Sequence, residues 1–349
     1  MYWDASGLGC YDCRTGRLLN VTPDIIQLLS AMGNWTTAIS LADQFGVEGG
    51  VRQIEQHLRQ YEKLGLVERA PATAEWPWAA WMPEAPFFHF GTRARLFPLD
   101  PREQDARLRA KALETPQPEP TKRSAGRRLS LPVPRALGAF SDCLLARRTW
   151  RNFSTEPVPL GDIATLLQLT WGVQKRGTVD RQGKVVLKTS PSGGARHPIE
   201  AYLLAVRVDG LKSGVYHYDA DQHELVDLKR PMSASVVEQL LGNQDYYHDA
   251  AAVVVMTAVV ERLFWKYPQG RGYRSILLDA GHLSQTFCLT ATALQLAPFC
   301  TMAFIEDDLE KVLRVDGVNE FAVFVTGVGS RAADHKARPG RIPPRRIPS

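Results

Sequence analysis

The chain of 349 residues lacks the sequence signatures of the commonest nucleotide-binding folds. It contains no Gly-x-Gly-x-x-Gly fingerprint, and this absence excludes a Rossmann dehydrogenase. It also lacks the glycine-rich phosphate loop with its lysine. A bound nucleotide would therefore have to be held by side-chain cations and helix ends.

Long apolar runs and paired cysteines are also scarce. The longest apolar run, Ala250 to Val260, is far shorter than the ~20 residues needed to span a bilayer. The five cysteines show no repeating spacing, which argues against a secreted disulfide scaffold. Because no charged-then-apolar leader is found at the N-terminus, we expect a cytoplasmic protein without a membrane partner.

One close cysteine pair, Cys10 and Cys13, has the spacing of half a zinc site. A structural zinc ion needs four ligands, and the pair has neither a second cysteine pair nor a nearby histidine. We therefore expect no metal, and the two thiols are interpreted as belonging to a hairpin.

Composition divides the chain into three parts. Residues 1–70 are typical of a small winged-helix domain, with a hairpin followed by helices that begin after Thr22, near Trp35 and near Val51. Residues 71–135 alternate tryptophans with prolines and then mix prolines with charges, which predicts an arm or linker. Residues 136–349 form the third part, and the end of the chain is strongly basic.

The third part has the pattern of a single α+β domain. A helix is expected to carry the arginines near residue 147, and the long helix from Arg274 to Leu296 is apolar on most faces and should be central. Strands are expected at 200–208, 214–218, 223–228, 251–259, 299–304 and 321–328, and further helices at 160–171, 233–241 and 306–313.

Two short motifs carry most of the chemical information. Arg147, Arg148 and Arg151 place three guanidinium groups within five positions, together with Thr149. Guanidinium groups bind phosphate through bidentate, charge-assisted hydrogen bonds. About forty residues later, the Ser-Gly-Gly turn that begins at Ser192 lets backbone donors approach a flat ligand. Together the motifs indicate a planar, phosphorylated cofactor, and a basic surface helix plus an ordinary turn is the alternative.

These residues resemble a known family. The motif Arg147-Arg148-Thr149-x-Arg151-x-Phe153 is similar to the opening motif of the nitroreductase fold, whose members bind FMN. The motifs Ser192-Gly193-Gly194-Ala195-Arg196-His197-Pro198-x-Glu200, Lys266-Tyr267 and Arg274-x-x-x-Leu278-x-Ala280-Gly281-His282 narrow the resemblance to SagB-type dehydrogenases, which oxidise azolines in ribosomally made peptides. The resemblance covers about residues 136–329.

The resemblance implies a fold and a set of cofactor ligands. The fold would be a nitroreductase-like α+β fold with a central, mostly antiparallel sheet and a long central helix. It would form a homodimer with FMN at the subunit interface. The FMN ligands it implies are Arg147, Arg148, Thr149 and Arg151 for the phosphate and ribityl chain, Ser192, Gly193, Gly194, Arg196 and His197 near the ring, and Arg338 and Arg341 to close the phosphate site.

Lys266 and Tyr267 are the residues that we expect to handle protons. Aromatising an azoline removes an activated proton beside a carbonyl and a hydride from the neighbouring carbon. A lysine acts as a base only if burial or a nearby cation lowers its pKa. In the alternative interpretation Lys266 extends along a surface helix and Tyr267 packs. His282 is interpreted as a hydrogen-bonded core histidine.

The N-terminal part has six basic and eight acidic residues, a net charge of −2. A negative domain repels nucleic acid, so we expect no nucleic-acid partner. The part is more similar to the leader-peptide clamps of peptide-modifying enzymes, where an extended peptide adds as a strand. A dimerisation or packing module is the alternative.

The whole chain is therefore predicted to be an FMN-dependent dehydrogenase of a peptide substrate, and a cyclodehydratase partner is implied only by analogy. Two alternatives remain open: an NAD(P)H-dependent reductase of small molecules on the same fold, and a flavin-less adaptor that binds peptide or DNA.

Overall fold

The computed structural model divides by its contacts into two units, Met1–Arg93 and Ala94–Ser349. It describes residues 2–4, 7–12, 17–32, 36–46, 50–64, 66–67, 78, 84–93, 101–115, 120, 137–179 and 183–332. No helix among these residues is both long and apolar enough to cross a membrane.

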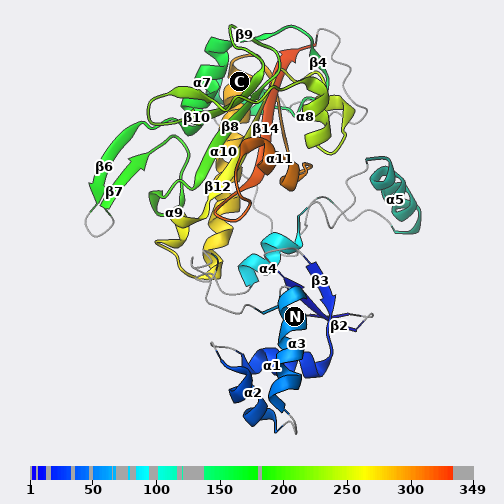
Figure 1. Cartoon of the computed structure of the whole chain (residues 1–349). Coiled ribbons are helices and arrows are strands. Elements are labelled where there is room, and N and C mark those ends of the chain that lie inside the picture. The colour runs from blue at the N-terminus through cyan, green and yellow to red at the C-terminus, as the bar shows by residue number, and fades with distance from the viewer. Residues whose placement is uncertain are drawn as a thin grey trace, which may run out of the picture. The chain divides into compact units, whose positions relative to one another are not determined.

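The first unit combines a small antiparallel sheet with helices (Figure 1). Its strands, in the order β1-β2-β3, are Tyr2–Asp4, Gly7–Asp12 and Arg17–Asn20, and its helices are α1 (Pro23–Ala31), α2 (Ala38–Phe45), α3 (Gly50–Leu64) and α4 (Glu84–Gly91). Leu28, Leu41 and Ile54 meet in one apolar core. The predicted hairpin and the first three helices are present, and their assignment to the winged-helix class remains a prediction.

The segment that composition predicts to be an arm contains two helices, α4 and α5 (Pro101–Glu114). Trp78, in the first unit, is fully buried, and its ring stacks on His89 of α4 with ring centroids 4.8 Å apart. Its ring centroid also lies 5.4 Å from that of Phe90. At least this tryptophan therefore belongs to a packed element.

The second unit is organised around one antiparallel sheet (Figure 1). Its strand order is β11-β10-β8-β12-β14-β13, and the short β4 pairs with the end of β14. These strands are β4 (Phe153–Ser154), β8 (Ile199–Ala205), β10 (Gly214–Asp219), β11 (Glu224–Asp227), β12 (Ala252–Val259), β13 (Ala297–Thr301) and β14 (Glu320–Arg331). The predicted α+β class and the mostly antiparallel central sheet are confirmed.

Helices flank this sheet, and α10 (Tyr273–Ala293) is the longest of those described. It is buried along one wide face and contacts β8, β13 and β14, which confirms the prediction of a long central helix. The other helices of this unit are α6 (Ala139–Ala146), α7 (Leu160–Trp171), α8 (Ala234–Leu240), α9 (Val260–Phe264) and α11 (Glu306–Leu313), with single 3-10 turns η3 (Gly193–Ala195), η4 (Asp245–Tyr247) and η5 (Gly270–Gly272).

One prediction about the arginines is wrong. Helix α6 ends at Ala146, so the stretch from Arg147 to Arg151 follows the helix and is not carried by it. The segment then turns toward the sheet, because the Trp150 amide donates to the Pro298 carbonyl 2.9 Å away. The side chains of this stretch are therefore presented by irregular backbone at a helix end.

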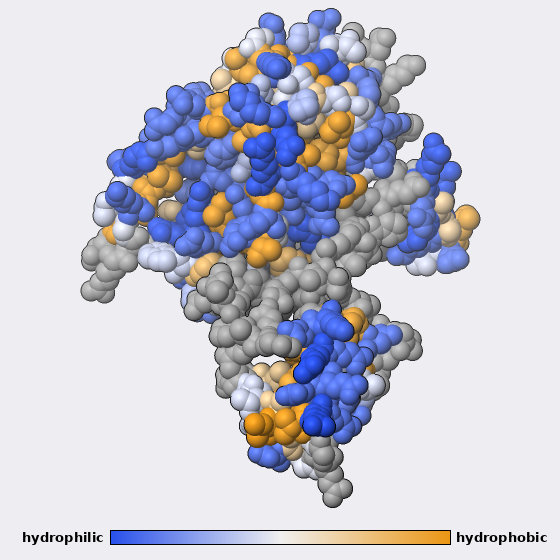
Figure 2. Space-filling view, in the orientation of Figure 1, coloured by the Kyte–Doolittle hydropathy of each residue, from blue (hydrophilic) through white to orange (hydrophobic). Residues whose placement is uncertain are grey.

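Two minor sheets complete the unit. Strands β5 (Val158–Pro159) and β9 (Val208–Asp209) pair in parallel. Strands β6 (Lys175–Val179) and β7 (Gly183–Leu187) form a hairpin that projects from the main sheet (Figure 1). Every residue of β6 is exposed. The visible surface around these elements is mostly hydrophilic, with apolar residues in small groups (Figure 2).

Candidate active site

The Ser-Gly-Gly turn connects the β6–β7 hairpin to β8 and has unusual backbone geometry. Gly194 has a φ of 60°, Ala195 of 55° and His197 of 45°. Left-handed backbone is uncommon for residues with a Cβ and concentrates at functional sites. Surrounding contacts must therefore hold this turn in place.

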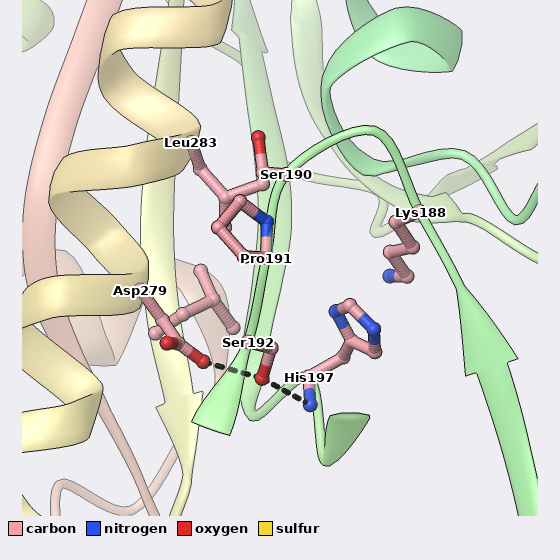
Figure 3. Close-up of a pocket in the computed structure, with 8 residues that line it drawn as sticks. Lys188, Ser190, Pro191, Ser192, His197, Asp279 and Leu283 are labelled. Atoms are coloured by element: carbon pink, nitrogen blue, oxygen red, sulfur yellow. Dashed lines mark hydrogen bonds between the residues drawn. The ribbon is translucent and has the colours of Figure 1, made fainter. Parts of the chain in front are cut away.

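A buried carboxylate on α10 supplies several of those contacts (Figure 3). Asp279, only 4% exposed, accepts from the Ser192 hydroxyl at 2.5 Å and from the Gly193 amide at 3.3 Å. The Ser192 oxygen accepts in turn from the His197 amide at 2.8 Å. Burial raises the pKa of Asp279, and the hydrogen bonds from Ser192 and Gly193 oppose that rise.

Sequence reasoning missed Asp279. It occupies an unspecified position inside the motif that runs from Arg274 to His282. A lone acid on an otherwise apolar helix face is the one signal that could have found it, since an unpaired carboxylate is rarely buried. The prediction that His282 lies in the core is wrong, because its side chain is exposed on α10; its hydrogen-bonding part is consistent with the structure, since Nδ1 lies 3.3 Å from the Pro191 carbonyl oxygen.

Lys266 and Tyr267 contact the same turn from the other side. They follow α9, and a Cβ built on Gly194 would lie 2.6 Å from Lys266 Nζ and 2.8 Å from Tyr267 Oη. Only a residue without a side chain allows these two polar groups so close to the backbone. The structure thus brings together two of the predicted motifs that are far apart in sequence.

The guanidinium group of Arg262, four residues before Lys266 in the chain, is bound at the other end of the turn. It pairs with Glu200 and donates to the His197 carbonyl oxygen at 3.2 Å. The Glu200 carboxylate also lies 3.0 Å from His217 Nε2, at hydrogen-bond distance. Burial would raise the pKa of Glu200, but the His217 hydrogen bond and the Arg262 charge bring it down to about 2. Arg262 therefore fixes the end of the turn.

Arg196 lies across the same turn. Its Nε donates to the Gly194 carbonyl at 3.1 Å, and its guanidinium carbon lies 5.3 Å from the ring centroid of Trp265. Its Nη2 is buried and has no hydrogen-bond partner within the described part of the chain. A buried donor left unpaired costs free energy, so this nitrogen suits a ligand atom.

The arginine stretch divides into engaged and available side chains. Arg148 donates to the carbonyl oxygens of Leu145 and Arg147, at 2.8 and 2.7 Å, and so completes the end of α6. Neither Arg147 nor Arg151 pairs with a carboxylate among residues 137–179 and 183–332, although Arg151 lies 5.6 Å from the ring centroid of Tyr246. Thr149 is half-buried beside them.

A pair of thiols lies close to these arginines. Cys288 of α10 hydrogen-bonds to Cys300 of β13, and this bond together with the positive charge of Arg147 lowers the pKa of Cys300. The same hydrogen bond, together with burial, raises the pKa of Cys288. The charges of Arg147 and Arg151 both act on Cys300, which shows that these arginines lie near this end of α10.

The two halves of the candidate site lie along α10. Asp279 contacts the Ser-Gly-Gly turn, and Cys288, nine residues later in α10, lies near the arginine stretch. At a rise of 1.5 Å per residue the two positions are about 14 Å apart along the helix axis. One small ion cannot touch both, whereas an elongated ligand with an anionic end and a flat end can.

The residues present fit FMN. The guanidinium groups of Arg147 and Arg151, which pair with no carboxylate among residues 137–179 and 183–332, match a phosphate, and the buried Arg196 nitrogen provides a spare donor. Of the thirteen predicted site residues, Arg338 and Arg341 lie outside the described residues.

Comparison with known proteins agrees with this geometry. The model of the nitroreductase family matches residues 144–330, from just before the arginine stretch to the end of β14. The chain belongs to the nitroreductase family. Members of this oxidoreductase family typically depend on a flavin, commonly FMN.

Individual relatives of this nitroreductase-family chain carry different names. A protein of Methanocaldococcus jannaschii named as a nitroreductase is 28% identical over 55% of this chain and 91% of its own length. The trifolitoxin-processing protein TfxB of Rhizobium leguminosarum bv. trifolii is 33% identical over 49% of this chain. The match spans only 48% of TfxB itself.

Among solved structures, the chain is similar to the E. coli microcin synthetase McbBCD complex with truncated pro-MccB17 bound. The similarity covers 66% of this chain and 92% of that chain, at 21% identity and a TM-score of 0.48. At that score the similarity carries no functional argument.

Proposed function

We propose that this chain is an FMN-dependent dehydrogenase of the SagB type that oxidises azoline rings in a ribosomally made peptide. The observation that carries the proposal is the contact of Lys266 Nζ and Tyr267 Oη with Gly194 in the turn proposed to hold the flavin ring. In the proposed reaction the proton-handling groups and the hydride acceptor must both reach the same pair of neighbouring substrate carbon atoms. The contact with Gly194 means that Lys266 and Tyr267 lie beside the turn proposed to hold the flavin ring.

Each part of the site has a separate task in this proposal. Arg147, Thr149 and Arg151 hold the phosphate and ribityl chain, and Ser192, Gly193 and Gly194 face the ring, with Arg196 and His197 beside them. FMN, when bound, supplies a two-electron acceptor for the hydride. Lys266 accepts the proton beside the carbonyl, and Tyr267 orients the lysine, so the substrate loses one proton and one hydride.

The peptide substrate is proposed from two observations. TfxB, whose printed name describes processing of trifolitoxin, shares 33% identity with residues of this domain. The first unit contains a three-stranded antiparallel sheet of the sort to which an extended leader peptide can add as a further strand. A leader held there would raise the effective concentration of its ring-bearing core at the flavin. A homodimer and a cyclodehydratase partner belong to the same proposal.

The experiment that tests this function is Lys266→Ala. Turnover of a synthetic thiazoline or oxazoline peptide, followed by mass spectrometry as the loss of two hydrogens, should fall at least about 100-fold, because a positioned base contributes about 10²–10⁴. FMN should stay bound, as shown by the visible spectrum. Lys184→Ala, on the exposed strand β7, is the matched control. Normal turnover by Lys266→Ala would refute the assignment of the base.

A reductase that draws on NAD(P)H is the second candidate. It is favoured by the M. jannaschii relative, which is named as a nitroreductase and is matched over 91% of its length. Anaerobic NAD(P)H should then bleach the flavin within the turnover time. Under the dehydrogenase proposal the azoline peptide bleaches it instead, so one anaerobic titration with each reductant separates the two functions.

A further inference from the structure

Two thiols in the second unit lie against each other, and the proposed function uses neither. Cys288 belongs to α10 and is buried, whereas Cys300 belongs to β13 and is half-buried. Both are free cysteines, and they hydrogen-bond to each other. The pair therefore brings two nucleophilic side chains together between the helix and the sheet.

The side chain of Cys300 points toward α10 because of the strand geometry. Its neighbour Phe299 is fully buried in the apolar cluster whose α-helical residues come from α8 and α11. Successive side chains of a strand point to opposite faces of the sheet, so Cys300 lies on the other face. Helix α10 packs against β13, and Cys288 comes from this helix.

Cys288 points toward the sheet from the helix side. It is buried, as are Ser284 and Thr292, which lie four residues before and after it on α10. Residues four apart share one face of a helix, and α10 contacts β8, β13 and β14. The two thiols therefore meet where α10 packs against β13, and their hydrogen bond agrees with both orientations.

The two thiols differ in reactivity. The hydrogen bond from Cys288 and the positive charges of Arg147 and Arg151 lower the pKa of Cys300. The same bond and burial raise the pKa of Cys288. The thiolate is the nucleophile, and Cys300 is the more exposed of the two. Cys300 is therefore suited to attack an oxidant, and Cys288 lies beside it to displace the product.

We propose that Cys288 and Cys300 form a reversible disulfide when the protein meets hydrogen peroxide, and that Cys300 reacts first. The Cys300 sulfur attacks one peroxide oxygen, the O–O bond breaks, and the other oxygen leaves as water. The Cys288 sulfur then attacks the Cys300 sulfur, so that the S–S bond forms and the S–O bond breaks with loss of a second water. The two thiols lose two hydrogens, and the peroxide is reduced to two waters.

The disulfide would change the charge beside the arginine stretch. It is neutral, so its formation removes the negative charge of the Cys300 thiolate near Arg147 and Arg151. These arginines are proposed to hold the FMN phosphate, and a neighbouring anion weakens their attraction for it. FMN should therefore bind more tightly to the oxidised pair. This consequence rests on the proposed function, whereas the disulfide itself does not.

The disulfide is tested on the full-length protein carrying Cys10→Ser and Cys13→Ser, so that the cysteine pair of the first unit cannot react. Hydrogen peroxide should remove two hydrogens from the intact mass, and digestion should yield a cross-link between the peptides of Cys288 and Cys300. Dithiothreitol should restore the original mass. Cys300→Ser should abolish the cross-link, and Cys288→Ser should leave Cys300 as a sulfenic acid that dimedone traps. Cys288→Ala replaces Cys288→Ser if that variant does not fold.

Cys143→Ser in the same background is the matched control. The Cys143 thiol donates to the Leu289 carbonyl at 3.2 Å, so it lies close to Cys288 without belonging to the hydrogen-bonded pair. Its replacement should leave the cross-link unchanged. A protein that loses no hydrogens to peroxide, or that forms its cross-link without Cys300 or through Cys143, overturns this inference.

The consequence for FMN is measured by titrating the apoprotein with FMN before and after oxidation. The Kd should fall by about two- to fivefold on oxidation, the size of a partly screened charge interaction, and Cys300→Ser should show no such difference. An equal or higher Kd after oxidation overturns the link to the arginines. A protein that binds no FMN in either state contradicts the proposed function, and the mass measurement still decides whether the disulfide forms.

Discussion

The arginine stretch and the Ser-Gly-Gly turn differ in how they can recognise a ligand. Arg147 and Arg151 keep their charges unpaired with any carboxylate in residues 137–179 and 183–332. Residues Ser192 to Gly194 of the turn carry no charge, and they donate hydrogen bonds of 2.5 and 3.3 Å to Asp279. The first region attracts an anion by its field, and the second presents a rigid shape. The electrostatic attraction of a ligand changes little when the ligand is displaced slightly, whereas a steric fit is lost.

Gly194→Ala is expected to have the largest effect, because it changes the shape of the turn. The new Cβ would lie 2.6 Å from Lys266 Nζ at a φ of 60°, so Lys266 and Tyr267 must move. We expect azoline-peptide turnover to fall at least about tenfold, and the free energy of unfolding to fall by about 1–2 kcal/mol. Turnover assays and urea denaturation measure the two effects.

Gly281→Ala is the matched control for this change. It lies on α10 with nothing within 4 Å of its Cβ position, and alanine in a helix stabilises by about 0.5–1 kcal/mol relative to glycine. If Gly194→Ala behaves like Gly281→Ala, the close contact does not matter for catalysis.

A smaller effect is expected from the arginine stretch. Arg147→Ala should weaken FMN binding about tenfold, because a charge-assisted hydrogen bond to phosphate is lost. The loss should shrink as salt is raised, since screening already weakens the wild-type contact. Titration of the apoprotein with FMN at two salt concentrations measures both effects.

Arg148→Ala shows whether the two neighbouring arginines differ in their effect on FMN binding. Its guanidinium group is bound to the Leu145 and Arg147 carbonyls, so we expect a lower melting temperature from the loss of this cap on α6 and a weaker effect on FMN than Arg147→Ala gives. A larger loss of FMN affinity in Arg148→Ala would reverse the division between engaged and available arginines.

The smallest effect concerns pH and the rigid turn. His197 has a pKa of about 4 when folded, against about 6.5 when unfolded. Between these values the unfolded chain binds more protons, so stability is present above about pH 6.5 and is lost as pH falls toward 4. Urea denaturation at pH 7 and pH 5 should show a larger drop in wild type than in His197→Asn, whose asparagine tolerates the positive φ. Equal drops would contradict the neutral imidazole.

Local patterns in the sequence were sufficient for most of the second unit. Alternating and continuous apolar runs predicted the strands of the main sheet and the long helix, because burial follows periodicity. The exposed hairpin β6–β7 escaped notice, since strands without a buried face leave little apolar pattern. The end of α6 was misplaced because arginine is a good helix former and nothing in the local sequence marks Ala146 as the last residue.

The chemical groups of the candidate site are visible in the sequence: three clustered arginines, a Ser-Gly-Gly turn and a Lys-Tyr pair, each recognisable within a few residues. Which of them contact one another follows from the fold. It joined Lys266 and Tyr267 to Gly194 and placed Asp279 beneath Ser192. It also left Arg147 available while Arg148 capped its own helix. These are contacts between residues distant in the chain or choices between alternative hydrogen bonds. Their free energies depend on packing, which no short stretch of sequence contains.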